Sequence, residues 1–436
     1  MKVSYCALGC KVNLYEAEAI INEFIDNGYE HGEFDEICDV YIINTCTVTS
    51  TSDSKSKKIV RQAVKRNPNA VVAVMGCSSQ LLFNDYANIP GVDIVLGTSN
   101  RHNLFSMVEK ILKEKNNNEK ILSHTDYKSI TNYEELKVER YNNRTRGFVK
   151  IQDGCDNFCS YCTIPYSRGP VRSRDPQNVV EEIQQLTDQG MKEIVLSGIN
   201  TGAYGKDLNN FTFSQMLDKI VKEVKGLGRI RVSSIEATEI NDSLLKVIKE
   251  NKEHFCMHFH IPLQGGCNNT LARMNRKYDI DYYREKINSI RKIFPDVNIT
   301  TDILAGFSGE TNEDFLDSYQ FIKEMKFGEM HVFPYSPRPL TKAYNFPDKI
   351  DEITKKYRVN QLLTLNKEMA LNYREKFLNE VVDVLVERNN NGKAFGHSSN
   401  YLEVEFYDNN AQSNDMVKVK IESIGYPICK GSVVNV

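Results

Sequence analysis

Three cysteines in one short segment have the types and spacing to bind a reactive metal centre. Cys155, Cys159 and Cys162 lie in the run GCDNFCSYC, which spans residues 154–162. Iron–sulfur clusters normally take four thiolate ligands. Three thiolates leave one iron with an open position, and an open position is what a catalytic metal needs to bind a substrate or cofactor. Taken alone, the spacing equally allows a zinc site or a cluster that only transfers electrons.

A second set of cysteines is dispersed along the first 80 residues. Cys10, Cys46 and Cys77 each follow an expected strand, and these strands span residues 3–8, 40–44 and 70–75. Because the carboxyl ends of parallel strands lie along one edge of a sheet, we expect these thiols to converge on one site. The alternative is that they are small buried hydrophobic residues. The other five cysteines are interpreted as structural: Cys6, Cys38, Cys256, Cys267 and Cys429.

The elements that must position the second set alternate between strand and helix. Short apolar segments typical of buried strands span residues 3–8, 39–44, 70–75 and 92–96, and the expected helices span residues 13–27 and 52–66. Nearly all-apolar strands separated by helices predict a parallel sheet covered on both faces. A stretch rich in Lys and Asn at 114–120 is typical of a linker. We therefore assign residues 1–120 to an N-terminal domain that carries the second cysteine set.

A second series of strands and helices positions the loop at 154–162. Six strands are expected at residues 148–151, 193–197, 230–235, 255–261, 297–304 and 329–334, with helices between them at 179–189, 213–224, 242–250, 282–293 and 313–325. This series predicts a partial (βα)6 barrel over residues 141–370. In such barrels the chemistry lies at the carboxyl ends of the strands, and the loop follows the first of them. The predicted fold class is therefore α/β.

The last part of the chain has a different pattern. A long helix is expected at 352–379, followed by alternating segments at 381–387, 401–407 and 416–421 with turn residues between them. This pattern predicts a small antiparallel β-barrel at residues 374–436, similar to folds that bind single-stranded nucleic acid.

Composition narrows the class of protein. The chain has 436 residues, 41% of them hydrophobic, a net charge of -3 and 11 cysteines. A long chain with an odd number of cysteines and no apolar leader is not expected to form a disulfide framework. No apolar run approaches the roughly 20 residues that cross a bilayer. We expect a cytoplasmic monomer without a membrane partner, in which any nucleic-acid contact comes from local basic patches.

The cysteine loop in its barrel context, with Tyr161 before the third cysteine, resembles the radical S-adenosylmethionine (SAM) superfamily. The resemblance implies that Cys155, Cys159 and Cys162 hold a catalytic [4Fe-4S] cluster. It also implies that this cluster binds SAM and cleaves it to a 5'-deoxyadenosyl radical. Further cofactor contacts are expected near the strand ends, where helix capping and turn formation are the alternatives. These candidate contacts are Tyr161, Ser197, Gly198, Ser234, Glu236 and Gly306.

Both cysteine sets together resemble the methylthiotransferase family over essentially the whole chain. The matching motifs are GCKVN at 9–13, NTCTV at 44–48, GC at 76–77, IPYSRG at 164–169, PLQGG at 262–266 and GFSGET at 306–311. The C-terminal segment resembles the TRAM domain of that family. The resemblance implies a second [4Fe-4S] cluster on Cys10, Cys46 and Cys77 that carries sulfur, with SAM as methyl donor and radical source. It further implies an external reductant and a sulfur source.

The motif around Cys10 indicates the substrate within this family. GCKVN is most similar to the MtaB type, which converts N6-threonylcarbamoyladenosine at position 37 of tRNA, in the anticodon loop, to its 2-methylthio derivative. Relatives that act on isopentenyladenosine usually read GCQMN, and those that act on a ribosomal-protein aspartate usually read GCPKN. Both remain alternatives, and an iron–sulfur electron carrier with an RNA-binding barrel is the non-enzymatic one.

Several clusters of basic and aromatic residues are candidates for RNA contact, although a solvated helix face or core packing explains many of them equally well. The basic candidates are Lys55, Lys57, Lys58, Arg61, Lys65 and Arg66 on one helix, Arg168, Arg172 and Arg174 after the cysteine loop, and Arg273, Arg276 and Lys277. The C-terminal barrel adds Phe395, His397, Tyr401, Phe406, Tyr407, Lys418 and Lys420.

Overall fold

A computed structural model describes residues 1–114, 119–141 and 144–434 of the chain. Most of the expected linker at 114–120 therefore lies outside the described residues, as do the last two residues of the chain. Within the described part, no helix is both long enough and apolar enough to pass through a membrane.

The N-terminal region is a six-stranded sheet in the order β2-β1-β3-β4-β5-β6, with every neighbouring pair parallel. Its strands are β1 (Lys2–Ala7), β2 (Glu30–His31), β3 (Val40–Thr45), β4 (Val71–Gly76), β5 (Ile94–Leu96) and β6 (Ile121–Ser123). Its helices are α1 (Lys11–Asp26), α2 (Ser50–Arg66), α3 (Cys77–Leu81), α4 (Phe83–Ala87) and α5 (Leu104–Lys113). All residues of β3 and β4 are buried, because α1 and α5 pack on one face of the sheet and α2 and α4 on the other. The predicted parallel, doubly covered sheet is confirmed.

The central region contains the six parallel strands that the sequence predicts, in two three-stranded sheets joined by a bridge between Ile230 and Phe255. The strands are β7 (Arg146–Lys150), β10 (Glu193–Ser197), β11 (Arg229–Val232), β12 (His258–His260), β13 (Asn298–Ala305) and β14 (Glu329–Pro334). A short antiparallel pair, β8 (Gln152–Asp153) and β9 (Arg172–Ser173), flanks the cysteine loop. The helices are α6 (Ile164–Arg168), α7 (Pro176–Asp188), α8 (Phe213–Glu223), α9 (Asp242–Glu250), α10 (Asn268–Arg273), α11 (Ile280–Ile293) and α12 (Asn312–Met325).

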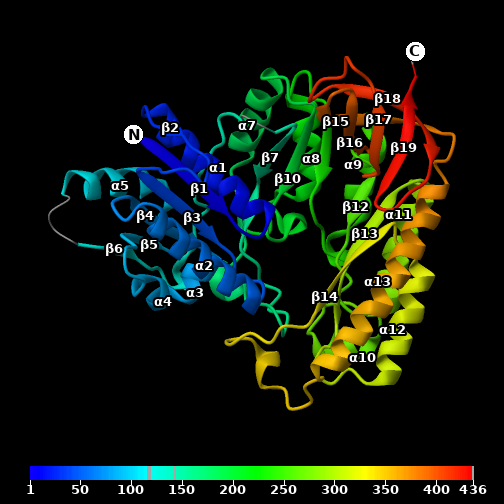
Figure 1. Cartoon of the computed structure of the whole chain (residues 1–436). Coiled ribbons are helices and arrows are strands. Elements are labelled where there is room, and N and C mark those ends of the chain that lie inside the picture. The colour runs from blue at the N-terminus through cyan, green and yellow to red at the C-terminus, as the bar shows by residue number, and fades with distance from the viewer. Residues whose placement is uncertain (115–118, 142–143, 435–436) are drawn as a thin grey trace.

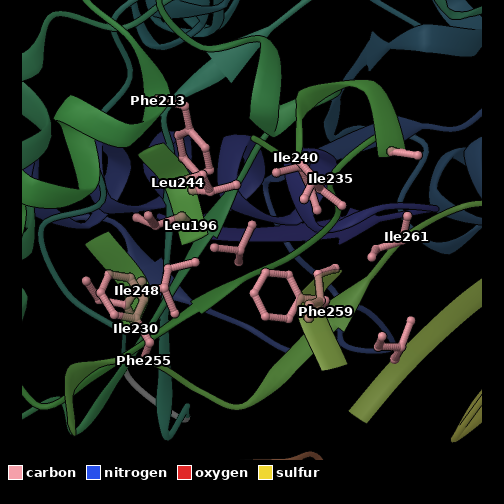
Figure 2. Packing of buried hydrophobic residues seen from close by; sticks show 14 of the residues in the cluster. Leu196, Phe213, Ile230, Ile235, Ile240, Leu244, Ile248, Phe255, Phe259 and Ile261 are labelled. Atoms are coloured by element: carbon pink, nitrogen blue, oxygen red, sulfur yellow. The ribbon is translucent and has the colours of Figure 1, made fainter. Parts of the chain in front are cut away.

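One large core joins these strands to their helices. Figure 2 shows Leu196 of β10 near Phe213 of α8 and Leu244 of α9, and Ile230 of β11 near Ile248 of α9 and Phe255. Each such side chain contributes roughly 1.5–3 kcal/mol when fully buried. Several of the helices begin at a capping residue. At Thr212, for example, a capping box with Gln215 satisfies two N–H groups, those of Thr212 and Gln215, at the start of α8.

The C-terminal region is a closed five-stranded barrel that follows a long helix, α13 (Glu352–Glu375). Its strands are β15 (Val381–Asn390), β16 (Lys393–Ser398), β17 (Glu403–Tyr407), β18 (Met416–Ser423) and β19 (Ile428–Val433), in the order β15-β16-β17-β19-β18. Four of the five pairings are antiparallel as predicted, whereas β17 and β19 are parallel. The sequence does not predict β16 or β19.

The three regions pack against one another (Figure 1). The N-terminal sheet lies beside β7 and β10, and α1 packs against β7. The C-terminal barrel covers the amino ends of the central strands, where the carbonyl oxygen of His397 accepts a 2.9 Å hydrogen bond from Arg229 and that of Asn400 accepts one of 2.8 Å from Asn298. Both cysteine sets belong to the opposite, carboxyl ends of the strands.

Candidate functional site

The cysteine loop is held tightly by its own backbone. The N–H of Cys155 donates to the carbonyl oxygen of Gly169 at 3.0 Å. Gly154 precedes it with φ +74°, and a Cβ atom there would lie 1.7 Å from the carbonyl oxygen of Pro170, so only glycine fits. The turn after α10 fixes the middle of the loop, since Asn275 donates from Nδ2 to the carbonyl oxygen of Phe158 at 2.9 Å. These contacts fix the backbone on both sides of Cys155 and around Phe158.

Two thiols of this loop, Cys155 and Cys162, lie in surroundings that disfavour bare thiolates. Burial raises the pKa of Cys155 to about 12, with a smaller contribution from the nearby Cys159 thiolate. Burial also raises the pKa of Cys162, next to the same neighbours. Arg276 donates from Nη1 to the Cys159 sulfur at 3.4 Å. Positive charge, which a cluster of iron ions would supply, would favour the thiolate forms of Cys155 and Cys162.

The second set lies where the strand pattern predicts. Cys10 caps the start of α1 after β1, Cys46 directly follows β3, and Cys77 begins α3 after β4. Gly9, with φ +92°, permits their close approach, because a Cβ atom at Gly9 would lie 2.5 Å from the Cys46 sulfur. Burial raises the pKa of each thiol, and each thiolate also raises the pKa of one of the others. The three strand ends thus bring the thiols within electrostatic reach of one another.

A single metal ion needs ligand atoms that lie close together. Tetrahedral zinc with Zn–S bonds of about 2.3 Å places its sulfurs about 3.8 Å apart. In the described part of the chain, the one group of three ligand atoms that lie within 4.8 Å of one another is formed by His260, Asp302 and His331. Neither cysteine set is that compact. That both sets hold iron–sulfur clusters, and not zinc, stays a prediction.

A buried ion-pair network connects the second cysteine set to the barrel. Arg168, at the end of α6, donates from Nε to the Cys77 sulfur at 3.1 Å and from Nη1 to Glu16 at 2.7 Å. Glu16 and Asp153 are the shared acceptors of this network, and both are buried. Glu16 contacts Arg101 and Lys150, whereas Asp153 contacts Lys150, Arg168 and Arg172.

This network carries more positive than negative charge. With Glu134, which pairs with Arg101, it contains three carboxylates. The four cations are Arg101, Lys150, Arg168 and Arg172. Because a buried charge is stable only when it is paired, the spare positive charge beside Cys77 suits a thiolate ligand.

The prediction that Arg168, Arg172 and Arg174 face phosphates is wrong. Their side chains are at most 3% exposed. Arg174 pairs with Glu135 and Glu182, and Arg172 donates to three backbone carbonyl oxygens. Arg276 is likewise buried, between Glu236, Tyr278 and the Cys159 sulfur. These arginines organise the site and do not contact solvent.

Several candidate SAM contacts gather around Arg276. Glu236 pairs with it, and the Tyr161 hydroxyl lies 3.4 Å from its Nη1 atom. Gly306 is followed by Phe307, whose ring centroid lies 6.3 Å from that of Tyr161. Three of the six candidates therefore lie around the cysteine loop.

Within the described residues, no hydrogen bond or ion pair joins the side chains of the other three candidates to that group. Ser197 donates its hydroxyl to the carbonyl oxygen of Val149, and a Cβ atom at Gly198 would lie 2.9 Å from Oε1 of Gln152. Packing and turn formation account for both. Ser234 ends the segment after β11 and is half-buried. The roles of all six candidates in binding SAM stay predictions.

The remaining candidate residues for RNA contact differ in whether their side chains are exposed or buried. On α2, Lys55, Lys58, Arg61 and Lys65 are exposed, whereas Lys57 pairs with Asp85 and Arg66 donates to the carbonyl oxygen of Phe34. In the C-terminal barrel Tyr407, Lys418 and Lys420 are exposed, whereas Phe395, His397 and Phe406 are buried. The exposed residues remain candidates for RNA contact. The buried ones are explained by packing.

Sequence reasoning missed the role of the buried arginines, although one signal was available. Glu16 lies one turn before Ile20 on the apolar face of α1, where an acidic side chain requires a cationic partner. Nothing local identifies that partner, because Arg168 is 152 residues away in the chain.

Two known families match the two regions of the chain that contain the cysteine sets. Residues 149–322 match the model of the radical SAM superfamily. Residues 2–97, which contain Cys10, Cys46 and Cys77, match the "Uncharacterized protein family UPF0004".

Curated relatives match the chain from end to end. The threonylcarbamoyladenosine tRNA methylthiotransferase MtaB of Bacillus subtilis is 42% identical, over 100% of this chain and 96% of its own length. MtaB of Thermotoga maritima is 34% identical, over 98% and 96%. The tRNA-2-methylthio-N(6)-dimethylallyladenosine synthase of Thermoanaerobacter pseudethanolicus is 33% identical, over 98% and 92%.

Solved structures share the fold at low sequence identity. The radical SAM methyltransferase TsrM of Kitasatospora setae superimposes with a TM-score of 0.61 at 13% identity, covering 79% of this chain and 76% of its own. Membership of the radical SAM superfamily implies a [4Fe-4S] cluster and SAM. The curated relatives are enzymes, so the alternative of a protein that only carries electrons is excluded. The two-part site and the end-to-end relatives lead to one assignment: the chain belongs to the radical SAM methylthiotransferase family.

Proposed function

We propose that this enzyme converts N6-threonylcarbamoyladenosine at position 37 of tRNA to its 2-methylthio derivative. The observation that carries the proposal is the 42% identity to an enzyme of that name over the entire chain. The GCKVN motif at residues 9–13 points to the same type. The substrate implies a cytoplasmic location, an external reductant and a sulfur source.

The two cysteine sets divide the chemistry between them in this proposal. When a [4Fe-4S] cluster and SAM are bound at Cys155, Cys159 and Cys162, they supply the radical that removes hydrogen from the substrate. Cys10, Cys46 and Cys77 would hold a second [4Fe-4S] cluster, which would supply the sulfur. Arg276 and Arg168 each donate to one sulfur, which supports thiolate ligands at both places. Arg168 also links the two parts of the site, since it belongs to α6 and contacts Glu16 of α1.

Three domains follow from the same proposal. Residues 1–120 would form the domain of the second cluster, residues 141–370 the SAM domain, and residues 374–436 the barrel that assists RNA binding. The exposed row Lys55, Lys58, Arg61 and Lys65 on α2 is the strongest basic candidate for phosphate contact, because these side chains form no ion pair within the described residues.

Nucleoside analysis tests the substrate. Deletion of the gene is expected to remove 2-methylthio-N6-threonylcarbamoyladenosine from total tRNA and leave N6-threonylcarbamoyladenosine in its place, measured by liquid chromatography and mass spectrometry. Expression of the wild-type chain should restore the product, whereas the Cys159→Ala chain should not. An unchanged profile for this nucleoside would reject the proposal.

The second candidate substrate is isopentenyladenosine in tRNA. Relatives with that activity are 33% identical or slightly more, which is lower than the 42% of the MtaB relative. Loss of the 2-methylthio-isopentenyl nucleoside in the same experiment would favour this candidate. Mass spectrometry of ribosomal proteins from the same strain tests the aspartate alternative.

A further inference from the structure

A histidine–aspartate–histidine array lies on the inner face of the central strands, outside both cysteine sets. Phe259 of β12 and Met330 of β14 pack into the core beneath the helices. Because strand side chains alternate, their neighbours His260 and His331 turn to the opposite face. Asp302, from β13, lies between the two imidazoles there.

The atoms of this array have the spacing that a single metal ion needs. His331 Nδ1 lies 3.1 Å from Oδ1 of Asp302, and His260 Nε2 lies 3.3 Å from Oδ2 of the same carboxylate. One ligand atom from each of the three residues lies within 4.8 Å of the other two. A tetrahedral zinc ion with bonds of about 2.0–2.1 Å to nitrogen and oxygen places its ligand atoms about 3.3–3.4 Å apart.

Hydrogen bonds alone explain this spacing less well. A hydrogen bond between a charged imidazole and a carboxylate is usually about 2.7–2.9 Å long. The other histidine–carboxylate pairs among the described residues are shorter: His397 lies 2.7 Å from Glu387, and His102 lies 3.0 Å from Glu134. The two contacts of Asp302 are longer than both, and they match the separation of two ligands on one ion.

A hydroxyl behind His260 orients its ring toward Asp302. The Thr300 Oγ1 atom lies 2.9 Å from His260 Nδ1, and His258 Nε2 lies 2.9 Å from the same oxygen. When the N–H at Nδ1 of His260 donates to Thr300, the lone pair of Nε2 is left on the side of Asp302. Histidine ligands of metal ions are almost always held by such a bond at their second nitrogen.

The negative charge of Asp302 is available to an ion. In the part of the chain that the structure describes, no Lys or Arg nitrogen lies within 4.0 Å of its carboxylate. Arg231 lies over the ring of Tyr401, which stacks on His258, and Glu193 already pairs with this arginine at 2.7 Å. Two neutral imidazoles and one carboxylate therefore give the array one negative charge, which favours a cation.

The array leads into the cysteine loop and is open on one side. Pro262, two residues after His260, accepts a 3.2 Å hydrogen bond from Arg276, which also donates to the Cys159 sulfur at 3.4 Å. The side chain of His260 is 13% exposed, whereas that of His331 is 59% exposed. Three protein ligands with one open side are the arrangement of catalytic zinc sites, since structural sites are closed by a fourth protein ligand.

We propose that His260, Asp302 and His331 form a binding site for a divalent transition-metal ion such as zinc. Imidazole and carboxylate groups are ligands that zinc accepts, whereas magnesium and calcium take oxygen ligands. The proposal concerns this chain whichever nucleoside it modifies. An ion bound there would place a Lewis acid inside the barrel, beside the cysteine loop.

Zinc binding to the anaerobically reconstituted enzyme tests the proposal. The iron content is measured first, and the zinc that the chain then binds is determined by equilibrium dialysis and mass spectrometry. Wild type is expected to bind one zinc ion per chain that His331→Asn and Asp302→Asn do not bind. Thr300→Val keeps the three ligands and should bind that ion about ten-fold more weakly, because the ring of His260 loses its support.

A histidine outside the array provides the matched control. His31 is exposed on β2, where its ring stacks on Tyr5. His31→Asn should bind zinc like wild type, and every variant should keep the iron content of wild type.

The X-ray absorption spectrum of zinc bound to wild type gives a readout that does not depend on the folding of any variant. The proposed site predicts nitrogen and oxygen neighbours at about 2.0–2.2 Å and no sulfur neighbour. A sulfur neighbour at about 2.3 Å would place the zinc on a cysteine and overturn the proposal. Equal zinc content in wild type, His331→Asn and Asp302→Asn would overturn it as well.

Discussion

Cys159→Ala is expected to abolish reductive cleavage of SAM while leaving the second cluster in place. The loop would keep only two thiolates, too few to hold a cubane cluster. Anaerobically reconstituted wild type should contain about eight irons per chain if both sets hold [4Fe-4S] clusters, and the variant about four. Formation of 5'-deoxyadenosine in the presence of dithionite, measured by chromatography, should fall to background.

A cysteine outside both sets provides the matched control. Cys6 lies within β1, is partly buried and donates to no partner in the described structure. Cys6→Ala should therefore keep the full iron content and the wild-type rate of 5'-deoxyadenosine formation. Persistent SAM cleavage by Cys159→Ala would contradict the assignment of the loop.

Arg168→Met is expected to destabilise the chain and to release the second cluster. The substitution keeps much of the side-chain volume but removes the guanidinium that contacts Glu16, Asp153, Asn13 and the Cys77 sulfur. Removing one partner of a buried ion pair costs about 3–5 kcal/mol. The midpoint of thermal unfolding should fall by about 5 °C or more. Iron content should fall toward about four per chain.

Two further arginine variants show whether charge or geometry matters. Arg168→Lys retains the charge but not the planar fork that contacts several acceptors at once, so it should lie between wild type and Arg168→Met. Arg61→Met, on the exposed face of α2, should leave the unfolding midpoint and the iron content unchanged. Full iron and an unaltered midpoint in Arg168→Met would show that the network does not hold Cys77.

The parts of the fold that the sequence predicts well have strong local patterns. The strands β3 and β4 begin with unbroken apolar runs, at residues 40–43 and 71–75, and each strand is fully buried in the structure. That pattern locates the strand ends, and with them Cys46 and Cys77, without any structural information. By contrast, β16 contains Gly396, His397 and Ser398, residues with weak strand preference, and it is recognisable only by its pairing with β15 and β17.

The sequence-based prediction was wrong mainly for the arginines near the cysteines, which it placed at the surface. A basic residue next to a site is interpreted from sequence as an exposed residue that contacts the ligand, because most arginines are exposed. Arg168 and Arg276 are buried because carboxylates from distant segments, Glu16 and Glu236, neutralise them. Such pairing depends on tertiary structure, so a sequence pattern cannot supply it.

The docking of the C-terminal barrel affects how its contribution to RNA binding can be measured. Arg229 and Asn298 donate to carbonyl oxygens of the segment around His397, and the Tyr401 ring stacks on His258 with centroids 4.7 Å apart. A chain truncated before residue 374 would leave these buried donors without acceptors. Weaker RNA binding by such a fragment could therefore result from damage to the catalytic half as well as from the loss of RNA contacts made by the barrel. The two roles become separable through point changes at the exposed Tyr407, Lys418 and Lys420.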